Sequence, residues 1–352
     1  MRPANETTFT STDEQLVHAV LAEYGEMTRC SVKQYLPQDE PRSYLYELLA
    51  DYPQRGGKML RSTLCIAMAR ATGGTVEDAL ATAAAIELMH NALLVHDDIE
   101  DASDERRGTP TLHSLYGMPL ALNAGDAMGL LSLRPLKENF HRLGLATALR
   151  IFEETERMAW ESTEGQALEL GWIRDNRVDV TDEDYLQMVL QKTCWLGAIH
   201  PLRVGCLIGA RGRLPLEPLV RLGFFYGAAF QIQDDLLNLE PGPEYGKETN
   251  GDLFEGKRTL MIIYALRSAG PRDRRELTAF LARPRTRRSK TSVERIRALL
   301  ARLGALEYAR AVARGLAGAA LYEFDRFFAG VPDSRDRRFM RSLVTWVLER
   351  TH

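Results

Sequence analysis

The segment VEDALATAAAIELMHNALLVHDDIED, residues 76–101, decides the fold class. It contains no glycine or proline and consists mostly of strong helix formers. Its apolar residues recur at steps of three and four, at Leu80, Ala84, Leu88, Ala92, Val95 and Ile99. Because this helix is apolar over most of its surface towards its C-terminal end, we expect it to lie inside a bundle of helices.

Helical periodicity continues through most of the chain, and alternating strand patterns are essentially missing. We expect further helices over residues 13–35, 146–170, 182–196, 216–239, 259–269, 291–303 and 307–328. Glycine and proline predict connections at 53–57, 73–74, 107–110, 212–218, 241–251 and Pro271. The prediction is an all-α protein with one domain over residues 11–352, preceded by a flexible N-terminal segment, 1–10.

The composition excludes some classes of protein. With 45 basic and 48 acidic residues in 352, the net charge of −3 is not that of a strongly basic nucleic-acid binder. The four cysteines (Cys30, Cys65, Cys194 and Cys206) share no C-x-x-C spacing, so we expect reduced thiols rather than a zinc module or disulfides. The absence of a secretory signal and of an apolar run of roughly 18–20 residues predicts a cytoplasmic protein without a transmembrane segment.

A basic stretch occupies residues 271–290, with eight basic residues against two acidic ones. We expect a solvated, arginine-rich surface loop there. Contact with nucleic acid is the weaker alternative.

Two acidic clusters end apolar helices. In DDIED (97–101), Asp97 and Asp101 lie on one helix face, about 6 Å apart along the axis. The second cluster is QIQDDLLN (231–238). Like charges one turn apart destabilise a helix unless a positive group neutralises them. Because Mg²⁺ typically takes one or two carboxylates plus phosphate oxygens and water, two facing clusters predict a cage for a diphosphate bridged by Mg²⁺. Each cluster alone also fits a solvated helix end.

Basic residues suited to phosphate lie in the short polar connections. GGKMLR (56–61) places Lys58 and Arg61 one turn apart, and DERRG (104–108) directly follows the first acidic cluster. Arginine suits bidentate contacts with phosphate. Each of these motifs is weak evidence when taken singly.

Together the motifs resemble those of the trans-type isoprenyl diphosphate synthases, the polyprenyl synthetase family. RGGKMLR, LVHDDIEDASDERRG, GQALEL, QKT, FQIQDD and GKETNGDLFEGKRTL occur in the family's order between about residues 55 and 260. The resemblance implies a single large helical bundle around a deep central cavity, of the isoprenoid synthase type. It also implies head-to-tail transfer of isopentenyl diphosphate to an allylic diphosphate (dimethylallyl, geranyl or farnesyl), with release of pyrophosphate, by an enzyme that is commonly a homodimer.

By resemblance, the site residues fall into groups. The Mg²⁺ ligands, for three ions per site, are Asp97, Asp98, Asp101, Asp234 and Asp235. The residues that would neutralise the diphosphate of the allylic substrate are Arg106, Lys192, Lys247 and Lys257. The residues that would bind the diphosphate of isopentenyl diphosphate are Lys58, Arg61, His90 and Arg107. The groups assigned to catalysis are Lys192, Thr193, Gln231 and Arg106, with Gln166 nearby. Asn238 departs from the family, in which many members carry a third aspartate at this position.

The physical chemistry agrees with these roles. Ionisation of the allylic carbon–oxygen bond builds negative charge on pyrophosphate, which fixed cations and metal ions stabilise. The carbocation must be kept from water by an apolar pocket. No side chain is an obvious base for the final proton loss, and released pyrophosphate is the family's usual candidate.

Product length depends on residues upstream of Asp97. Leu93, Ala92 and Met89 lie four, five and eight positions before it. In the family, aromatic residues at the first two positions stop growth at short products, and here both are smaller. Met89, about one turn deeper, would block the channel after a further isoprene unit. We therefore predict geranylgeranyl diphosphate (C20), with C25 or longer products, or farnesyl diphosphate, as alternatives.

Two other classes remain open. A class I terpene cyclase usually carries N-D-x-x-S-x-x-x-E as its second metal motif, and FQIQDD stands in that place. A non-catalytic regulatory subunit fits the fold but not the full set of charged residues. Turnover of isopentenyl diphosphate by the chain alone separates both from the synthase.

Overall fold

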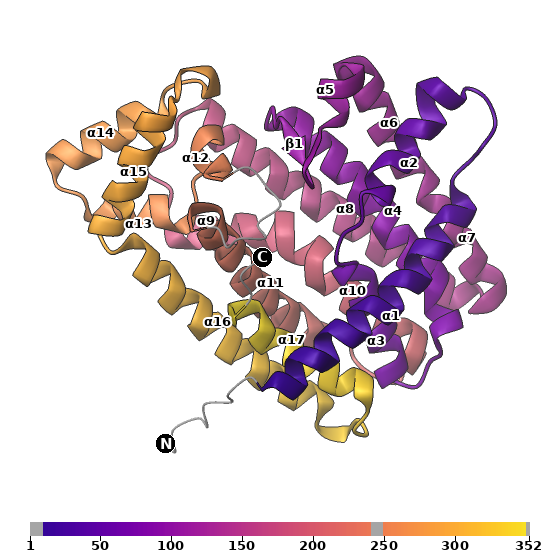
Figure 1. Ribbon diagram of the computed structural model, residues 1–352. Coiled ribbons are helices and arrows are strands. Elements are labelled where there is room, and N and C mark those ends of the chain that lie inside the picture. The colour runs from indigo at the N-terminus through magenta and orange to yellow at the C-terminus, as the bar shows by residue number, and fades with distance from the viewer. Residues whose placement is uncertain (1–9, 241–248, 350–352) are drawn as a thin grey trace.

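Helix α4 (Val76–Glu100) lies at the centre of the bundle, as predicted. In the computed structural model, which describes residues 10–240 and 249–349, α4 begins after Thr75, whose hydroxyl accepts a hydrogen bond from the Asp78 amide. It contacts α3 (Leu60–Ala71), α6 (Met118–Leu131) and α7 (Leu133–Arg142) (Figure 1). Within the described residues the all-α prediction is confirmed.

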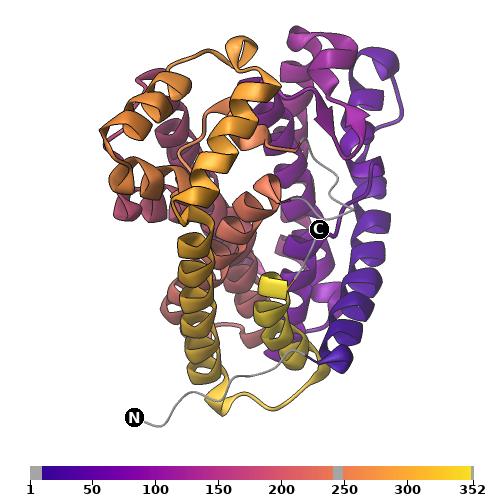
Figure 2. The same cartoon turned by 60° about the vertical axis from the view of Figure 1, so that its left-hand side comes forward.

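The remaining long helices form the rest of the bundle: α1 (Ser11–Tyr35), α8 (Leu145–Arg174), α10 (His200–Ala210), α11 (Glu217–Leu239), α16 (Ala305–Phe327) and α17 (Arg335–Glu349). In Figure 2, α16 in gold and α1 in indigo run along opposite sides, with α17 in yellow between them. Helix α11 packs along α16, and α10 packs along α3.

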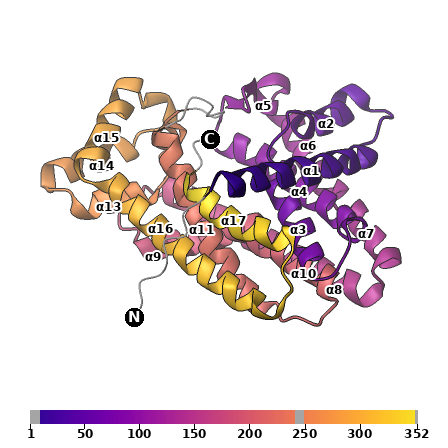
Figure 3. The ribbon, with the colours of Figure 1, turned by 60° about the horizontal axis from the view of Figure 1, so that its bottom comes forward.

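Shorter helices complete the chain: α2 (Glu47–Gln54), α5 (Leu112–Tyr116), α9 (Asp182–Val189), α12 (Gly251–Glu255), α13 (Leu260–Ser268), α14 (Pro271–Leu281) and α15 (Lys290–Arg302). A wide π-type helical stretch, η2 (Leu190–Ile199), joins α9 to α10, and short turns occur at η1 (Arg42–Tyr46), η3 (Arg285–Arg287) and η4 (Phe328–Gly330). Helices α13, α14 and α15 gather at one corner of the molecule (Figures 1 and 3).

Helix α4 contacts three clusters of buried apolar residues. Ile86 belongs to the cluster with α1, α3 and α10, and Leu88 belongs to that with α2 and α6. Leu93 is partly buried and packs against the cluster with α9, α11 and α13. By length and composition alone α4 could cross a membrane, but 67% of its most apolar window is buried inside the protein, as in a core helix. The expectation that this helix lies inside the bundle is confirmed.

The expected arginine-rich loop over 271–290 is wrong for residues 271–281, which form α14, whereas 282–289 do form a connection. Pro271 begins α14, where its missing N–H costs nothing because the first helical amides have no partner within the helix. Leu277, Phe280 and Leu281 bury one face of this helix, which the high charge had concealed. Pro53, taken as a connection, similarly lies in the last turn of α2.

One further difference is a short hairpin, and part of the prediction lies outside the described residues. A two-residue hairpin, β1 (Glu105–Arg106) with β2 (Thr109–Pro110), lies where only a connection was expected. Residues 1–9 and Lys247 lie outside the described residues, so the flexible segment 1–10 and the single domain over 11–352 stay predictions.

The close contact between α10 and α3 predicts that one added methyl group would strongly lower the stability of the protein. A Cβ on Gly209 would lie 2.1 Å from the Ala69 carbonyl oxygen. We expect Gly209→Ala to lower the free energy of unfolding by about 2 kcal/mol or more, because packed backbones must separate. Urea unfolding followed by circular dichroism measures it.

Gly171 in α8 is the matched control, because nothing lies within 4 Å of a Cβ built there. Gly171→Ala should raise stability by up to about 1 kcal/mol, the helix propensity difference. Equal effects of the two substitutions would contradict the close approach.

Candidate active site

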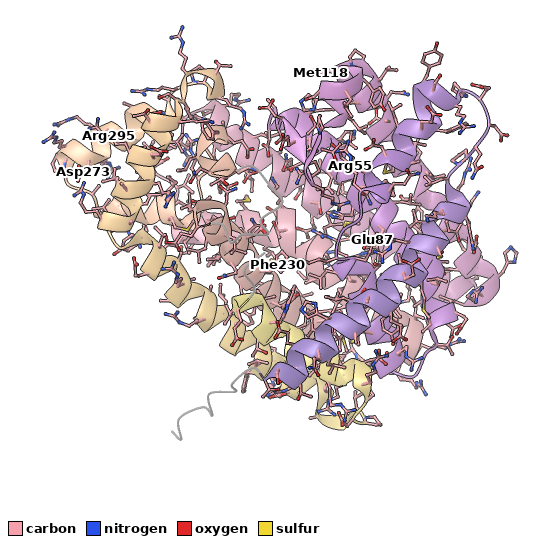
Figure 4. The ribbon with its side chains drawn as sticks, in the orientation of Figure 1. Arg55, Glu87, Met118, Phe230, Asp273 and Arg295 are labelled. Carbon is pink, nitrogen blue, oxygen red and sulfur yellow. The ribbon has the colours of Figure 1, made fainter. Side chains whose placement is uncertain are left out.

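A cavity of about 790 Å³ opens among α4, α8, η2, α11 and α12, with the segment 57–61 and the β-hairpin at its rim. Glu87 on α4 and Phe230 on α11 both line it and both lie near the middle of the molecule in Figure 4. The cavity has acidic walls, a basic side and an apolar part formed by Leu93, Leu94, Leu196 and Phe230.

The α4 wall carries Asp97 and Asp101, and both line the cavity. Lys192 Nζ lies 3.3 Å from Asp97, and Lys257 Nζ lies 2.7 Å from Asp101. The helical spacing thus places both carboxylates on one face, and lysines from two other segments neutralise them.

Asp98 points to the other side of α4. It is fully buried, accepts a hydrogen bond from the Tyr52 hydroxyl at 2.5 Å and one from Arg106 Nε at 2.9 Å, and does not line the cavity. Arg106 does line the cavity, so Asp98 orients a cavity arginine rather than presenting a free carboxylate. Tyr52 was not identified from the sequence, because it lies 46 residues away from its partner.

The facing wall is α11. Asp234 and Asp235 line the cavity, and Asp235 accepts hydrogen bonds from the Tyr185 hydroxyl at 2.8 Å and Gln231 Nε2 at 2.7 Å. Thr193 donates to Gln231 Oε1 at 3.0 Å. Three predicted residues are therefore joined by hydrogen bonds, and Tyr185 is a further residue of the site that the sequence did not indicate.

Asn238 has a visible structural role. Its side-chain oxygen accepts a hydrogen bond from the Asp252 amide at 3.1 Å, in the first turn of α12. Its own carbonyl accepts one from the Asn250 amide at 2.9 Å. The asparagine therefore fixes the start of α12 beside the acidic wall.

Lys192 and Thr193 lie in the π-type stretch η2, where the His200 amide bonds to the Trp195 carbonyl five residues back. Such wide turns are frequent at functional sites. Gly165 on α8 permits the close approach, because a Cβ there would lie 2.2 Å from the Lys192 amide nitrogen. Lys192 then forms an ion pair with Glu169, a residue of the GQALEL motif to which the sequence assigned no role.

Gln166 lines the cavity and donates to Glu100 at 2.5 Å.

The hairpin presents Arg107 at its tip. Arg107 and Gly108 both have positive φ, +56° and +71°, as a two-residue turn between twisted strands requires. Arg107 Nη1 donates to the Tyr52 carbonyl at 3.1 Å and also bonds to the Gly56 carbonyl. The hairpin therefore joins the RRG motif to the GGK motif.

The basic side contains Lys58, Arg61, His90 and Arg107, all of which line the cavity. Within the described residues, Arg61 Nε and His90 Nδ1 are buried without a hydrogen-bond partner. Buried polar groups are normally satisfied, so these two atoms point to a missing ligand. Glu87, which the sequence analysis did not single out, accepts a hydrogen bond from the Ser62 amide at 3.3 Å and faces Arg61 and Arg107 electrostatically.

Burial and charge set the protonation of the site. Burial opposes ionisation of Asp97, but Lys192, Lys257 and Arg106 outweigh it and lower its pKa. Burial, aided by Asp97 and Glu255, raises the pKa of Asp101 to about 7 despite Lys257. Burial and then Arg61 and Arg107 hold the pKa of His90 well below its ordinary value, so its imidazole is neutral at pH 7.

The donor set fits Mg²⁺ only together with a substrate. Among residues 10–240 and 249–349, no three His, Cys, Asp or Glu side chains gather closely enough to hold a metal ion alone. The cavity carboxylates offer oxygen, and Mg²⁺ commonly completes its shell with phosphate oxygens and water. A diphosphate between the acidic walls would supply the missing ligands.

Of the three residues assigned to chain length, Leu93 lines the cavity, whereas Met89 and Ala92 do not. Ala92 is buried against α6, 4.0 Å from the Cβ position of Gly129. Met89 is partly buried and packs with Leu93 against the cluster that contains α11.

Comparison with known proteins agrees with this geometry. The profile of the polyprenyl synthetase family matches residues 42–300. A short chain isoprenyl diphosphate synthase of Methanothermobacter thermautotrophicus is 32% identical over 95% of this chain and 98% of its own length. A geranylfarnesyl diphosphate synthase of Aeropyrum pernix is 32% identical over 84% of this chain and 91% of its own.

Solved structures share the fold. The geranylgeranyl pyrophosphate synthetase of Pyrococcus horikoshii superimposes with a TM-score of 0.85 at 29% identity, covering 97% of this chain and 100% of that one. The geranylgeranyl pyrophosphate synthase of Corynebacterium glutamicum, in complex with isoprenyl diphosphate and magnesium, superimposes with a TM-score of 0.85 at 25% identity. The match covers 94% of this chain and 99% of that one. The helical bundle is thus of the isoprenoid synthase type. The chain belongs to the polyprenyl synthetase family and is an isoprenyl diphosphate synthase, a prenyltransferase.

Proposed function

We propose that the enzyme condenses isopentenyl diphosphate with an allylic diphosphate, depends on Mg²⁺, and makes geranylgeranyl diphosphate as its main product. One observation carries the proposal. A single cavity holds two separate places for a diphosphate: the basic side, with two unsatisfied buried nitrogens, and the space between the acidic walls. A cyclase needs only the second.

On the basic side, Lys58, Arg61, His90 and Arg107 bind isopentenyl diphosphate. The neutral imidazole of His90 donates to phosphate through one nitrogen without adding charge. The negative charge of Glu87 favours the charged forms of Arg61 and Arg107.

Between the acidic walls, Asp97, Asp101, Asp234 and Asp235 would hold Mg²⁺. When bound, the metal supplies Lewis-acid stabilisation of the departing diphosphate. Lys192, Lys257 and Arg106 place fixed positive charge beside the same carboxylates, where the departing diphosphate would lie. The three-ion count and the part of Lys247 stay predictions.

Further into the cavity, residues of η2 and α11 face the allylic carbons. The hydrogen bond from Thr193 to Gln231 fixes two oxygen dipoles beside the developing cation. Leu93, Leu196 and Phe230 exclude water from it.

Activity measurements test the proposal directly. Purified enzyme is incubated with Mg²⁺, labelled isopentenyl diphosphate and dimethylallyl, geranyl or farnesyl diphosphate, and the products are dephosphorylated and sized. We expect Asp97→Ala and Asp234→Ala each to lower kcat about 10²–10³-fold, because charge developing on the leaving group loses its stabilisation.

Asp104→Ala is the control, since Asp104 is exposed next to the site and does not line the cavity. Its kcat should equal that of the wild type. No incorporation with any primer, with Mg²⁺ present, would reject the synthase in favour of a cyclase or a regulatory subunit.

The chain-length proposal rests on the α4 face below Asp97. Leu93 and Met89 precede Asp97 at one-turn intervals on that face, and Phe230 lies on the facing wall. Leu93 lines the cavity, and Met89 packs with it behind the lining, against the cluster that contains α11. Relatives with similar identity carry names for different product lengths, so sequence similarity leaves C25 as the alternative. The side chain of Met89 would then end the space available to the growing prenyl tail.

Replacing Met89 tests this floor. Met89→Ala should shift the main product from C20 to C25 or longer, because the channel deepens by most of a side chain. Met128→Ala should leave the product unchanged, because Met128 is buried in the cluster of α2 and α6 and not beside the cluster that contains α11. Unaltered products in Met89→Ala would show that Met89 is not the floor of the channel. A C25 product from the wild type would exclude geranylgeranyl diphosphate as the main product.

We further infer a homodimer formed through α5–α8. Most of the exposed large apolar side chains in the described residues lie on these helices: Leu115, Tyr116, Met118, Leu122, Leu130, Leu133, Phe140, Leu145, Leu149, Phe152, Trp160 and Leu168. Such concentration is typical of a protein–protein interface. A cytoplasmic location stays a prediction.

Charge on that face should dissociate the dimer. We expect Leu122→Glu with Phe152→Glu to give a species of 39.6 kDa by light scattering, and the wild type to give twice that mass. Tyr322→Glu, on α16 and 63% exposed, should stay dimeric. A monomeric wild type would refute the inference.

A further inference from the structure

The turn after α12 carries a lysine into the active site. Lys257 Nζ lies 2.7 Å from Asp101 on α4 and 2.7 Å from Glu255 on α12, and its amide bonds to the Asp252 carbonyl at 2.9 Å. Its ammonium therefore reaches across the cavity between two elements. The path of the turn, residues 254–258, decides whether it arrives there.

Arg288 holds this turn from outside the cavity. It comes from the connection between α14 and α15, is 5% exposed, and donates to the Phe254 carbonyl at 2.6 Å. It also donates to the Leu281 carbonyl at 2.8 Å and the Phe280 carbonyl at 3.4 Å. These carbonyls end α12 and α14, where the helix dipoles are negative.

The guanidinium fits against the turn itself. Gly256 has φ +75°, and a Cβ there would lie 2.5 Å from Arg288 Nη2. From the opposite side Arg258 bonds to the Gly256 carbonyl, and also to the Arg177 carbonyl at 3.0 Å and Asn176 Oδ1 at 2.8 Å. Two buried arginines thus clamp one glycine turn.

Arg288 differs from the other basic residues of its stretch. Arg272, Arg274, Arg275, Arg283, Arg287 and Lys290 are exposed, and Arg285 is partly buried and forms an ion pair with Glu255 at 3.5 Å. Asp273 and Arg295, on α14 and α15, lie at the outer corner of the molecule (Figure 4). Among the described residues no carboxylate lies within ion-pair distance of Arg288, and burial lowers its pKa. A charge buried without an ionic partner is costly, so its hydrogen bonds to the turn need a reason.

We propose that Arg288 is a positioning residue for Lys257. By fixing the carbonyl of Phe254 and the path past Gly256, it sets the reach of the Lys257 ammonium to Asp101 and to the allylic diphosphate. This assignment rests on the proposed function, in which Lys257 neutralises the leaving group. It gives part of the basic stretch 271–290 a role in the active site.

Steady-state kinetics of Arg288→Met separates positioning from general damage. We expect kcat to fall and KM for the allylic diphosphate to rise, each about tenfold, with KM for isopentenyl diphosphate unchanged. Arg288→Lys should recover part of the loss, because it keeps one donor for the carbonyls. Arg287→Met, an exposed neighbour, should match the wild type.

A double-mutant cycle with Lys257→Met gives the sharper test. If Arg288 acts through Lys257, Arg288→Met should change kcat less than twofold in the Lys257→Met background. If Arg288→Met does not fold, Arg288→Lys takes its place in the cycle. Equal losses in both backgrounds, or a matching rise in KM for isopentenyl diphosphate, would overturn the proposal.

Binding of pyrophosphate in the presence of Mg²⁺, measured by calorimetry, provides a readout independent of turnover. Arg288→Met should weaken it about tenfold in the enzyme with Lys257 and leave it unchanged in Lys257→Met. A wild type inactive with every primer would refute the proposed function, whereas this cycle would still decide the role of Arg288. Equal weakening in both backgrounds would reject that role.

Discussion

The pairing of Asp97 and Asp101 with Lys192 and Lys257 is the interaction on which the rest of the site depends. Two carboxylates one turn apart repel each other and weaken the end of their helix unless cations approach closely. The cations come from η2 and from the turn after α12, so both segments must be held against α4. Gly165 allows the approach of η2, and Arg288 with Arg258 holds the turn. The surrounding fold can be understood as the support of these two contacts.

Much of this could be predicted from the sequence. The period of residues 76–101 predicts a central helix, and six motifs in order predict the family and most of the charged side chains that line the cavity. The sequence did not reveal Tyr52, Glu87, Glu169 and Tyr185 as parts of the site. Their partners lie on other segments, as with Tyr52 and Asp98 across 46 residues, and no local pattern marks such contacts.

The errors have physical causes. Helix α14 was missed because Pro271 and the many arginines suggested a loop, although proline is well suited to a first helical turn and only one face of the helix needs apolar residues. The metal role predicted for Asp98 stays a prediction, and the helix turns this residue by about 100° from Asp97, towards Tyr52 and Arg106. In the second cluster, Asn238 replaces a charge with an amide whose oxygen holds the start of α12.

The same lysine pairs have a consequence for the life of the protein before it meets a substrate. Since Lys192 and Lys257 already lie against the α4 carboxylates, the repulsion at this helix end is offset by side chains of the same chain. A metal ion arriving with a diphosphate would share these carboxylates with ammonium groups that are already there.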